Sequence, residues 1–513
     1  MFSQWHGRRS RTPCRSRAVK AGCGGARSGR IEEHPEPEVP VPDSTPEQDE
    51  YDVAVIGAGP AGTAAALRAA ELGARVVVLE AARVGGTCVN TGCVPTRVLA
   101  KTARMMRETR SAGDYGIEIG TPVLDWAATV RHVHERVDLV RSIKREAQRF
   151  EEAGVDLIHE GRARFVDEST LVLDSGRRIR ARSIMVCVGG HSRRLPIPGA
   201  ELATVPEDVL GLTGLPRRVA VIGGGNTGAQ LVTVFNAFGS EVTLLDVAPR
   251  ILMTSDSSIS EHVASAFERQ GVRVRTGIET VSGIERQDDG SLAITWREGG
   301  EDRTAEVDVV IMATGWPADV EDLGLENAGI EVVRSAIPAD QYFRTVVPHI
   351  FAVGDANGRD MLVQAAQFEA EAAAENAVLG ANRRTPQFLL PAGGFTDPDY
   401  AGVGFTQEQA RERDPQCVVA SVPFSNLDRA VIDDRENGFL TLIADRRREL
   451  LLGAHAVGEN AIEVVQSVTT AMAAGVDLAT LANVRFAYPT YSAVIGMAAR
   501  ALLAEPARPT ELD

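Results

Sequence analysis

Residues 51–62 read Tyr-Asp-Val-Ala-Val-Ile-Gly-Ala-Gly-Pro-Ala-Gly, a short apolar run that ends in a glycine-rich turn. An apolar run of this length that stops at glycine is typical of a buried parallel strand. The alanine-rich residues 61–72 predict a helix that ends at Gly73, and residues 75–80 predict a second buried strand. The segment therefore predicts a strand–helix–strand unit with parallel strands.

A second unit of the same kind follows later in the chain. Residues 218–222 predict a strand, a glycine-rich turn comes next, and a helix to about residue 238 leads to a strand at residues 241–246. The interval from Gly57 to Glu80 equals the interval from Gly223 to Asp246, at 23 positions each. This equal spacing indicates an internal duplication.

Each turn contains the pattern G-x-G-x-x-G, in which the glycines allow a tight turn, close approach of a pyrophosphate and close helix packing. The free N–H groups of the following helix attract phosphate, and an acid at the end of the next strand binds ribose hydroxyls. A plain strand-to-helix turn is the alternative, but strand, turn, helix and acid all occur twice. We therefore expect two dinucleotide sites. A carboxylate at Asp246 repels a 2′-phosphate and favours NAD over NADP.

The remaining composition limits the class of protein. A net charge of -16 over 513 residues disfavours nucleic acid and anionic membranes as partners. The longest apolar stretch, residues 53–67, is too short to span a bilayer, so no transmembrane helix is expected. Residues 1–50 are first rich in arginine and serine and then in proline and acids, and we expect them to be disordered. These residues are a transit peptide, a basic tail or an over-extended start. We expect a cytoplasmic protein, or a protein of an organelle matrix if they are a transit peptide.

Two cysteines lie close together in the segment Cys88-Val89-Asn90-Thr91-Gly92-Cys93. Their spacing differs from that of most zinc sites and no second ligand pair follows, so no metal is expected. A structural disulfide is one alternative, and a redox-active pair beside a cofactor fold is the better one. Cys187 lies in an apolar run and is expected in the core.

Residues 85–96, Gly-Gly-Thr-Cys-Val-Asn-Thr-Gly-Cys-Val-Pro-Thr, strongly resemble the signature of class I pyridine nucleotide-disulfide oxidoreductases. This family includes dihydrolipoamide dehydrogenase, glutathione reductase and mercuric reductase. The resemblance extends over about residues 51–503. It includes Ala313-Thr314-Gly315, Val353-Gly354-Asp355 and Phe395-Thr396-Asp397-Pro398.

The resemblance implies an α/β fold with two Rossmann-like domains, which bind FAD and NAD(H) or NADP(H), and a C-terminal α+β dimerisation domain. The expected boundaries are residues 51–195 with 316–385 for FAD, 196–315 for the nucleotide and 386–513 for a homodimer interface. Cys93 would contact the flavin and Cys88 would attack the substrate. The implied cofactor contacts are Gly57, Gly59, Gly62, Glu80, Gly86, Thr87, Arg97, Ala163, Gly189, Gly354, Asp355, Gly223, Gly225, Gly228, Gln230, Asp246 and Gly315.

The chain departs from the family near its C-terminus. Members that act on dithiols or disulfides carry a histidine before Pro-Thr and a glutamate five residues later, where this chain has Tyr488 and Ala493. A phenol with an ordinary pKa near ~10 is a poor general base at neutral pH. Mercuric reductases also carry tyrosine here, but their C-terminal pair of cysteines is missing from this chain. In a dimer, Tyr488 would approach the partner subunit's Cys88. His455 lies in an apolar run and is expected to be structural.

A second departure lies beside the expected flavin. Family members usually place a lysine and a glutamate where this chain has Arg97 and Gln230. The net charge of the pair changes from zero to +1, which would stabilise the Cys93 thiolate and reduced flavin. The alternative is a neutral exchange in which Arg97 pairs elsewhere.

These features predict an NAD(P)H-dependent flavoprotein that passes electrons through Cys93 and Cys88 to a small-molecule disulfide, a soft metal ion or a quinone-like electrophile. One alternative is dihydrolipoamide dehydrogenase activity, in which Tyr488 or water takes the proton of a thiol. Another is a flavoprotein of low activity that acts as a redox sensor.

Overall fold

The computed structural model describes residues 48–384 and 389–504, all of which belong to one unit that begins at Pro46. The expectation of disorder for residues 1–47 lies outside the described residues. For residues 48–50 it is wrong, because strand β1 (Gln48–Ile56) begins three residues before Tyr51. These polar residues pair through their backbones with residues 178–180, a contact that a hydrophobic pattern does not reveal.

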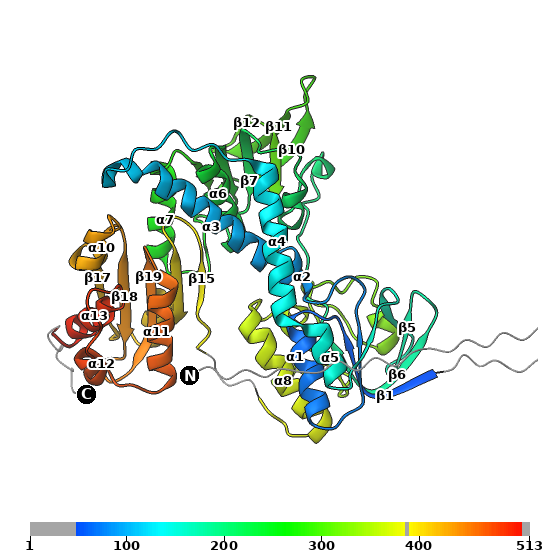
Figure 1. The fold of residues 1–513 in the computed structure, drawn as a ribbon. Coiled ribbons are helices and arrows are strands. Elements are labelled where there is room, and N and C mark those ends of the chain that lie inside the picture. The colour runs from blue at the N-terminus through cyan, green and yellow to red at the C-terminus, as the bar shows by residue number, and fades with distance from the viewer. Residues whose placement is uncertain (1–47, 385–388, 505–513) are drawn as a thin grey trace, which may run out of the picture. The chain divides into compact units, whose positions relative to one another are not determined.

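The first sheet has seven strands and carries the first glycine-rich turn (Figure 1). Its order is β3-β2-β1-β6-β5-β4, and β14 also pairs with β6. The strands around β1 are parallel, as expected for buried strands that end at glycine. The further strands are β2 (Val76–Leu79), β3 (Asp156–Ile158), β4 (Ala163–Phe165), β5 (Thr170–Leu173), β6 (Arg178–Val186) and β14 (Ile350–Ala352).

The helices of this part lie before and after the redox motif. Helices α1 and α8 run side by side in Figure 1 and contact each other along much of their length. Helix α1 is rich in alanine, which lets the two helices approach closely. Cys88 lies in the short helix α2, and Cys93 is the first residue of α3. The bounds are α1 (Pro60–Glu71), α2 (Gly86–Asn90), α3 (Cys93–Arg110), α4 (Trp126–Lys144), α5 (Glu146–Glu152) and α8 (Val363–Leu379).

The second glycine-rich turn belongs to a parallel sheet of four strands in the order β13-β7-β8-β9. A separate antiparallel sheet, β10-β11-β12, follows it in the chain. The elements are β7 (Arg218–Ile222), α6 (Asn226–Phe238), β8 (Glu241–Asp246), α7 (Ser257–Arg269), β9 (Arg273–Thr276), β10 (Thr280–Arg286), β11 (Leu292–Glu298), β12 (Glu301–Val307) and β13 (Val309–Met312).

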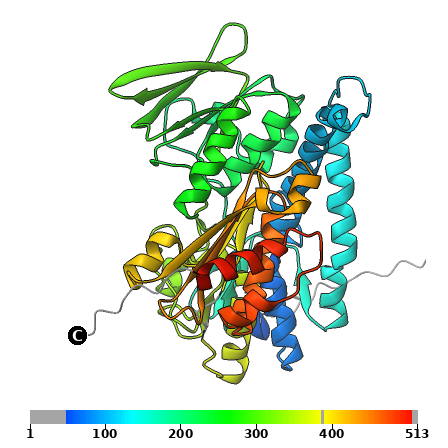
Figure 2. The same cartoon turned by 90° about the vertical axis from the view of Figure 1, so that its left-hand side faces the viewer.

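The C-terminal part is built on an antiparallel sheet of five strands, β15-β16-β19-β18-β17. Helices α11 and α13 pack on this sheet, and Figure 2 shows them in orange and red in front of the strands. The elements are β15 (Ala392–Gly394), β16 (Tyr400–Gly404), α9 (Gln407–Arg413), β17 (Val418–Pro423), α10 (Asp428–Ile432), β18 (Phe439–Ala444), β19 (Leu451–Val457), α11 (Ala461–Ala473), α12 (Leu478–Asn483) and α13 (Ala493–Ala504).

Short 3-10 helices connect several of these elements. They are η1 (Ala112–Tyr115), η2 (Ala200–Leu202), η3 (Pro206–Gly211), η4 (Leu325–Ala328), η5 (Gly354–Asn357) and η6 (Phe424–Asn426).

The predicted fold class is confirmed: two parallel α/β units carry the glycine-rich turns, and a separate α+β part follows them. Strand β14 returns to the first sheet after the second unit is complete, so residues far apart in sequence share one sheet. The boundaries at residues 195, 315 and 385 stay predictions. Among the described residues, no helix is long and apolar enough to cross a membrane.

Candidate functional site

The two glycine-rich turns have the same backbone geometry. The first glycine of each has a left-handed φ, +97° at Gly57 and +101° at Gly223. The third glycine of each turn packs against the first. A Cβ added to Gly62 would lie 1.8 Å from the backbone oxygen of Gly57, and a Cβ added to Gly228 would lie 1.9 Å from that of Gly223. No other residue fits these third positions without moving the turn.

The acid at the end of the second strand of each unit is bound to its own turn. Both oxygens of Glu80 accept backbone N–H groups, from Ala58 at 2.7 Å and from Ala82 at 2.7 Å. Asp246 repeats this pattern, since its oxygens accept from the N–H of Gly224 at 2.6 Å and of Ala248 at 2.8 Å. The duplication seen in the sequence therefore extends to individual hydrogen bonds.

These residues fit the dinucleotides that the sequence predicts. Helices α1 and α6 begin directly at the turns, with Gly59 and Gly225 as their N-caps and no side chain capping the free N–H groups. A carboxylate has about four acceptor positions. Glu80 and Asp246 each use two for backbone groups, so each keeps acceptors for ribose hydroxyls.

The redox motif lies against the first turn. Gly86 has a φ of +56°, and an added Cβ there would lie 2.8 Å from Cα of Gly59. Thr87 follows it in α2, one residue before Cys88. A dinucleotide held at the first turn therefore lies close to the helix that carries the cysteine.

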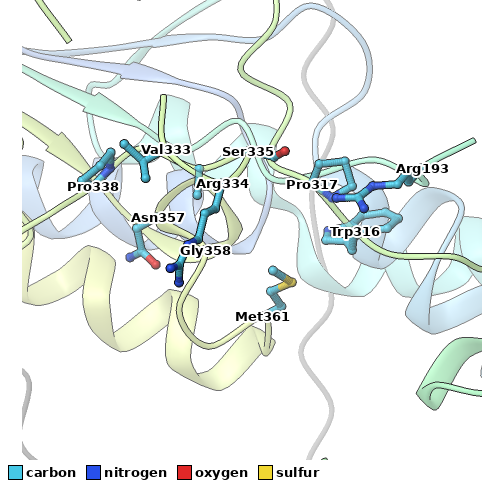
Figure 3. A pocket seen from close by; sticks show the side chains of 11 residues that line it. Arg193, Trp316, Pro317, Val333, Arg334, Ser335, Pro338, Asn357, Gly358 and Met361 are labelled. Atoms are coloured by element: carbon cyan, nitrogen blue, oxygen red, sulfur yellow. The ribbon is translucent and has the colours of Figure 1, made fainter. Parts of the chain in front are cut away.

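The later FAD candidates lie beside the same turn. An added Cβ on Gly354 would lie 3.4 Å from Cβ of Ala61 in α1. Asp355 accepts a hydrogen bond from the indole of Trp316 at 2.8 Å. Burial raises the pKa of Asp355, and this hydrogen bond opposes the rise. Trp316 also lines a cavity of about 420 Å³ together with Arg193 and Met361 (Figure 3).

The remaining predicted contacts are dispersed. Ala163 is buried in strand β4 and Gly189 lies in the loop after β6, where its carbonyl accepts the N–H of Asp319. Gly315 has a φ of +127° and directly precedes Trp316. The surroundings of these three residues do not test whether they bind a cofactor, so their cofactor contacts stay predictions.

Cys88 and Cys93 are free thiols in this structure, Cys88 partly buried and Cys93 exposed. They interact with each other through a hydrogen bond, which lowers the pKa of Cys93 and raises that of Cys88. Arg97 lowers the pKa of Cys93 further by its charge, and burial adds to the rise at Cys88. The two sulfurs therefore differ: Cys93 favours the thiolate and Cys88 keeps its proton. The oxidised disulfide stays a prediction.

Arg97 stands where family members usually carry a lysine. Its guanidinium donates to the side-chain oxygen of Gln230 in α6 and lies over the ring of Phe395, with Cζ 3.4 Å from the centroid. Gln230 is buried and donates in turn to the backbone oxygen of Asn226. Among the described residues Arg97 forms no salt bridge, but the charge of Asp399 acts on it, and burial lowers the pKa of Arg97.

Tyr488 is placed differently from the expected base. Its side chain is 80% exposed, and its phenol donates a hydrogen bond of 2.6 Å to Asp428. This bond and the charge of Asp428 raise the pKa of Tyr488. A contact with the partner subunit's Cys88 stays a prediction, and the raised pKa leaves even less phenolate at neutral pH to accept a proton.

Two residues for which the sequence predicts a structural role, Cys187 and His455, lie in the core. Cys187 is buried after strand β6, and burial raises its pKa. His455 is buried in β19 and bonded through its ring to the backbone oxygen of Phe405 at 2.8 Å. Within the described residues, no group of three or more histidine, cysteine or acidic side chains is arranged to hold a metal.

Sequence reasoning missed the partners of several site residues. The sequence marks Phe395 only as the start of a domain, and it indicates no role for Trp316 or Asp428. Each contacts a site residue that is distant in sequence, so no local pattern could reveal the contact. The same is true of Lys144 and Glu146, whose charges act on Cys88.

Two family models match the chain. The model described as pyridine nucleotide-disulphide oxidoreductase matches residues 51–370, and the model of the dimerisation domain of the same family matches residues 390–499. Apart from the first three residues of β1, the sheets with the two glycine-rich turns fall in the first range, and the five-stranded sheet falls in the second.

Individual relatives extend over nearly the whole folded part. A dihydrolipoyl dehydrogenase of Thermus scotoductus is 33% identical over 466 residues, which cover 88% of this chain and 97% of the relative. A mercuric reductase of Bacillus cereus is 32% identical over 447 residues, covering 86% and 70%. The solved structure of the HOCl-induced flavoprotein disulfide reductase RclA from Escherichia coli is 26% identical with a TM-score of 0.78, covering 88% of this chain and 99% of that one. The chain therefore belongs to the pyridine nucleotide-disulphide oxidoreductase family of enzymes.

Proposed function

We propose that the chain is an FAD-dependent reductase that takes electrons from NADH and delivers them through Cys93 and Cys88 to a disulfide, a soft metal ion or a quinone-like electrophile. The observation that carries this proposal is the unequal pair of thiols. Cys93, beside Arg97, favours a thiolate, while Cys88 lies in a separate short helix and keeps its proton. Such a pair suits one sulfur to the cofactor and the other to the substrate.

FAD, when bound, would carry an electron pair between the nicotinamide and the cysteines. The residues proposed to hold it are those of the first turn with Glu80, Thr87 and Asp355. Arg97 and Gln230 would face the same region, and the positive charge of Arg97 would favour negative charge on Cys93.

The second turn and Asp246 are proposed to hold NAD rather than NADP. Asp246 is held by two backbone N–H groups at the position where a 2′-phosphate would lie. The nearby Arg250 donates to the backbone oxygens of Leu252, Met253 and Ser255, so its guanidinium is already engaged. This engagement disfavours Arg250 as the partner of such a phosphate.

A homodimer is part of the proposal, supported by the match of residues 390–499 to a dimerisation domain. The family relatives leave the acceptor open, since those named include a dihydrolipoyl dehydrogenase, a mercuric reductase and a disulfide reductase. The bond from Tyr488 to Asp428 disfavours dihydrolipoamide oxidation, because that direction needs a base for the thiols of the substrate.

The test is an anaerobic titration of the FAD-loaded protein with NADH, followed by assays with a panel of disulfides, Hg(II) and quinones. We expect NADH to bleach the flavin, and at least one electrophile to be turned over only while Cys88 is intact, with Cys88→Ser as the comparison. Bleaching without any acceptor would favour the redox sensor instead. Efficient oxidation of dihydrolipoamide with NAD would favour the dehydrogenase and contradict the proposal.

A further inference from the structure

Cys88 must lose a proton before it can attack, and the C-terminal segment offers it no good base. The hydrogen bond with Cys93 keeps Cys88 protonated. Tyr488 keeps its proton and donates a hydrogen bond to Asp428, and Ala493 has no group that accepts a proton. If the proposed function is correct, another group near Cys88 has to accept this proton.

Glu146 is a buried acid beside the helix of Cys88 that no step described so far uses. It is the first residue of α5 and is only 8% exposed. One of its oxygens lies 3.3 Å from the position that a Cβ on Gly85 would take, and Gly85 is the N-cap of α2. The carboxylate therefore faces the start of the short helix in which Cys88 is the third residue.

Lys144 holds this carboxylate from the end of α4. Its Nζ lies 3.7 Å from the other oxygen of Glu146, and among the described residues it is the one ion-pair partner of Glu146. The same end of α4 is attached to α2, because Arg141 donates to the side-chain oxygen of Asn90 at 2.7 Å. The acid, the lysine and the cysteine helix are thus fixed relative to one another.

The charged groups that act on Cys88 come from three neighbouring elements. They include Cys93 and Arg97 from α3, Lys144 from α4 and Glu146 from α5. Cys93 in turn faces Arg97 and Asp355. If the Cys93 thiolate accepted the proton, the thiolate would be lost, so the carboxylates are the better acceptors. Of the two carboxylates, Asp355 acts on Cys93, and Glu146 acts on Cys88.

We propose that Glu146 accepts the proton of the Cys88 thiol, with Lys144 holding the carboxylate in place, and that this pair replaces the base missing from the C-terminal segment. With a disulfide as substrate, Cys88 Sγ gives its proton to Glu146 and bonds to one substrate sulfur while the substrate S–S bond breaks. The leaving thiolate takes the proton from Glu146. The Cys93 thiolate then attacks Cys88 Sγ and closes the Cys88–Cys93 disulfide, and the second leaving thiolate takes a proton from water. The substrate gains two electrons and the cysteine pair loses two.

The experiment separates proton transfer from simple charge by the direction in which two rates change. In the FAD-loaded Glu146→Gln variant, turnover of dithiobis(nitrobenzoate) with NADH should fall by ~10²-fold or more at neutral pH, as when a general base is removed. The loss should shrink as pH rises, because hydroxide then deprotonates Cys88. Alkylation of Cys88 by iodoacetamide in the reduced protein uses the same sulfur and should also slow, whereas removal of an acid that acted only through its negative charge would speed it.

Lys144→Gln should slow both rates, because the loss of its positive charge disfavours the Cys88 thiolate. The matched control is Glu152→Gln in the same helix, where an exposed acid pairs with Arg145 and should leave both rates unchanged. Glu146→Asp keeps a carboxylate and should recover part of the activity and the original pH profile, which also answers the case in which Glu146→Gln folds poorly.

The proposal is overturned if Glu146→Gln speeds turnover together with alkylation, since Glu146 would then only oppose the thiolate. It is also overturned if neither rate changes. Failure of the proposed function looks different. The wild-type protein would then reduce no disulfide with NADH, and alkylation at Cys88, located by peptide mass analysis, would still report whether Glu146 acts on its thiol.

Discussion

The guanidinium of Arg97 lies over the ring of Phe395, with Cζ 3.4 Å from the ring centroid, and donates to the side-chain oxygen of Gln230. Helix α3, which begins at Cys93, is thereby fixed to the start of the C-terminal part and to helix α6 of the second unit. A cation held in this way one turn after Cys93 favours the negative form of that sulfur.

Replacing Arg97 with glutamine should therefore raise the pKa of Cys93. A lowered thiol pKa means that the thiolate is present at neutral pH and is lost as pH falls, so the variant should lose its thiolate at a higher pH than the wild type. The measurement is the pH dependence of iodoacetamide alkylation at Cys93 in the reduced protein. Arg104→Gln, on the same helix but paired with Glu108 and Glu459, is the control. Equal profiles for Arg97→Gln and wild type would refute an effect of Arg97 on Cys93.

The duplicated turns predict two separate losses. In Gly62→Ala the new Cβ would lie 1.8 Å from the Gly57 oxygen, so the first turn must move and FAD content should drop severely. In Gly228→Ala the same clash, at 1.9 Å from the Gly223 oxygen, should leave FAD bound but weaken reduction by NADH. Absorbance of the purified protein and rapid reduction kinetics measure the two effects.

Gly113→Ala is the control for both variants, because nothing lies within 4 Å of an added Cβ at that position. If Gly62→Ala kept its flavin and Gly228→Ala lost it, the assignment of the two units would have to be exchanged.

The sequence was sufficient for these units because their signals are local. A glycine that needs a left-handed φ, an alanine-rich helix and an acid at a fixed spacing each act within about thirty residues of chain. The start of β1 at Gln48 was missed because its polar residues pair through their backbones, without a hydrophobic pattern. The helical state of Cys88 was not predicted either.

The contacts that distinguish this site from a generic member of its family were beyond the sequence. Trp316 reaches Asp355, and Phe395 reaches Arg97, only after separate elements have packed together. The same holds for Glu146, whose carboxylate faces α2 because α4 and α5 meet at that point. Such contacts depend on tertiary packing, which residue spacing does not encode.

Asp246 should make the protein prefer NADH over NADPH, because a second anion at this strand end is repelled. Replacing Asp246 with serine should reduce the ratio of the two kcat/KM values by ~10-fold, about 1.4 kcal/mol of discrimination. Glu241→Gln, at the exposed start of the same strand, should leave the ratio unchanged. A wild-type preference for NADPH would contradict the role given to Asp246.

Tyr488 should be dispensable for electrophile reduction, because its phenol is bound to Asp428 and its pKa is raised. Tyr488→Phe is therefore expected to retain NADH-dependent turnover within ~2-fold, the range of an exposed hydrogen bond of small net value. The double variant Tyr488→His, Ala493→Glu restores the base and acid that related dithiol enzymes carry, and should gain oxidation of dihydrolipoamide by NAD. Steady-state assays in both directions measure the two variants. Loss of all activity in Tyr488→Phe would show that the phenol itself takes part in the reaction, and would move the search for the proton acceptor of Cys88 from Glu146 back to the C-terminal segment.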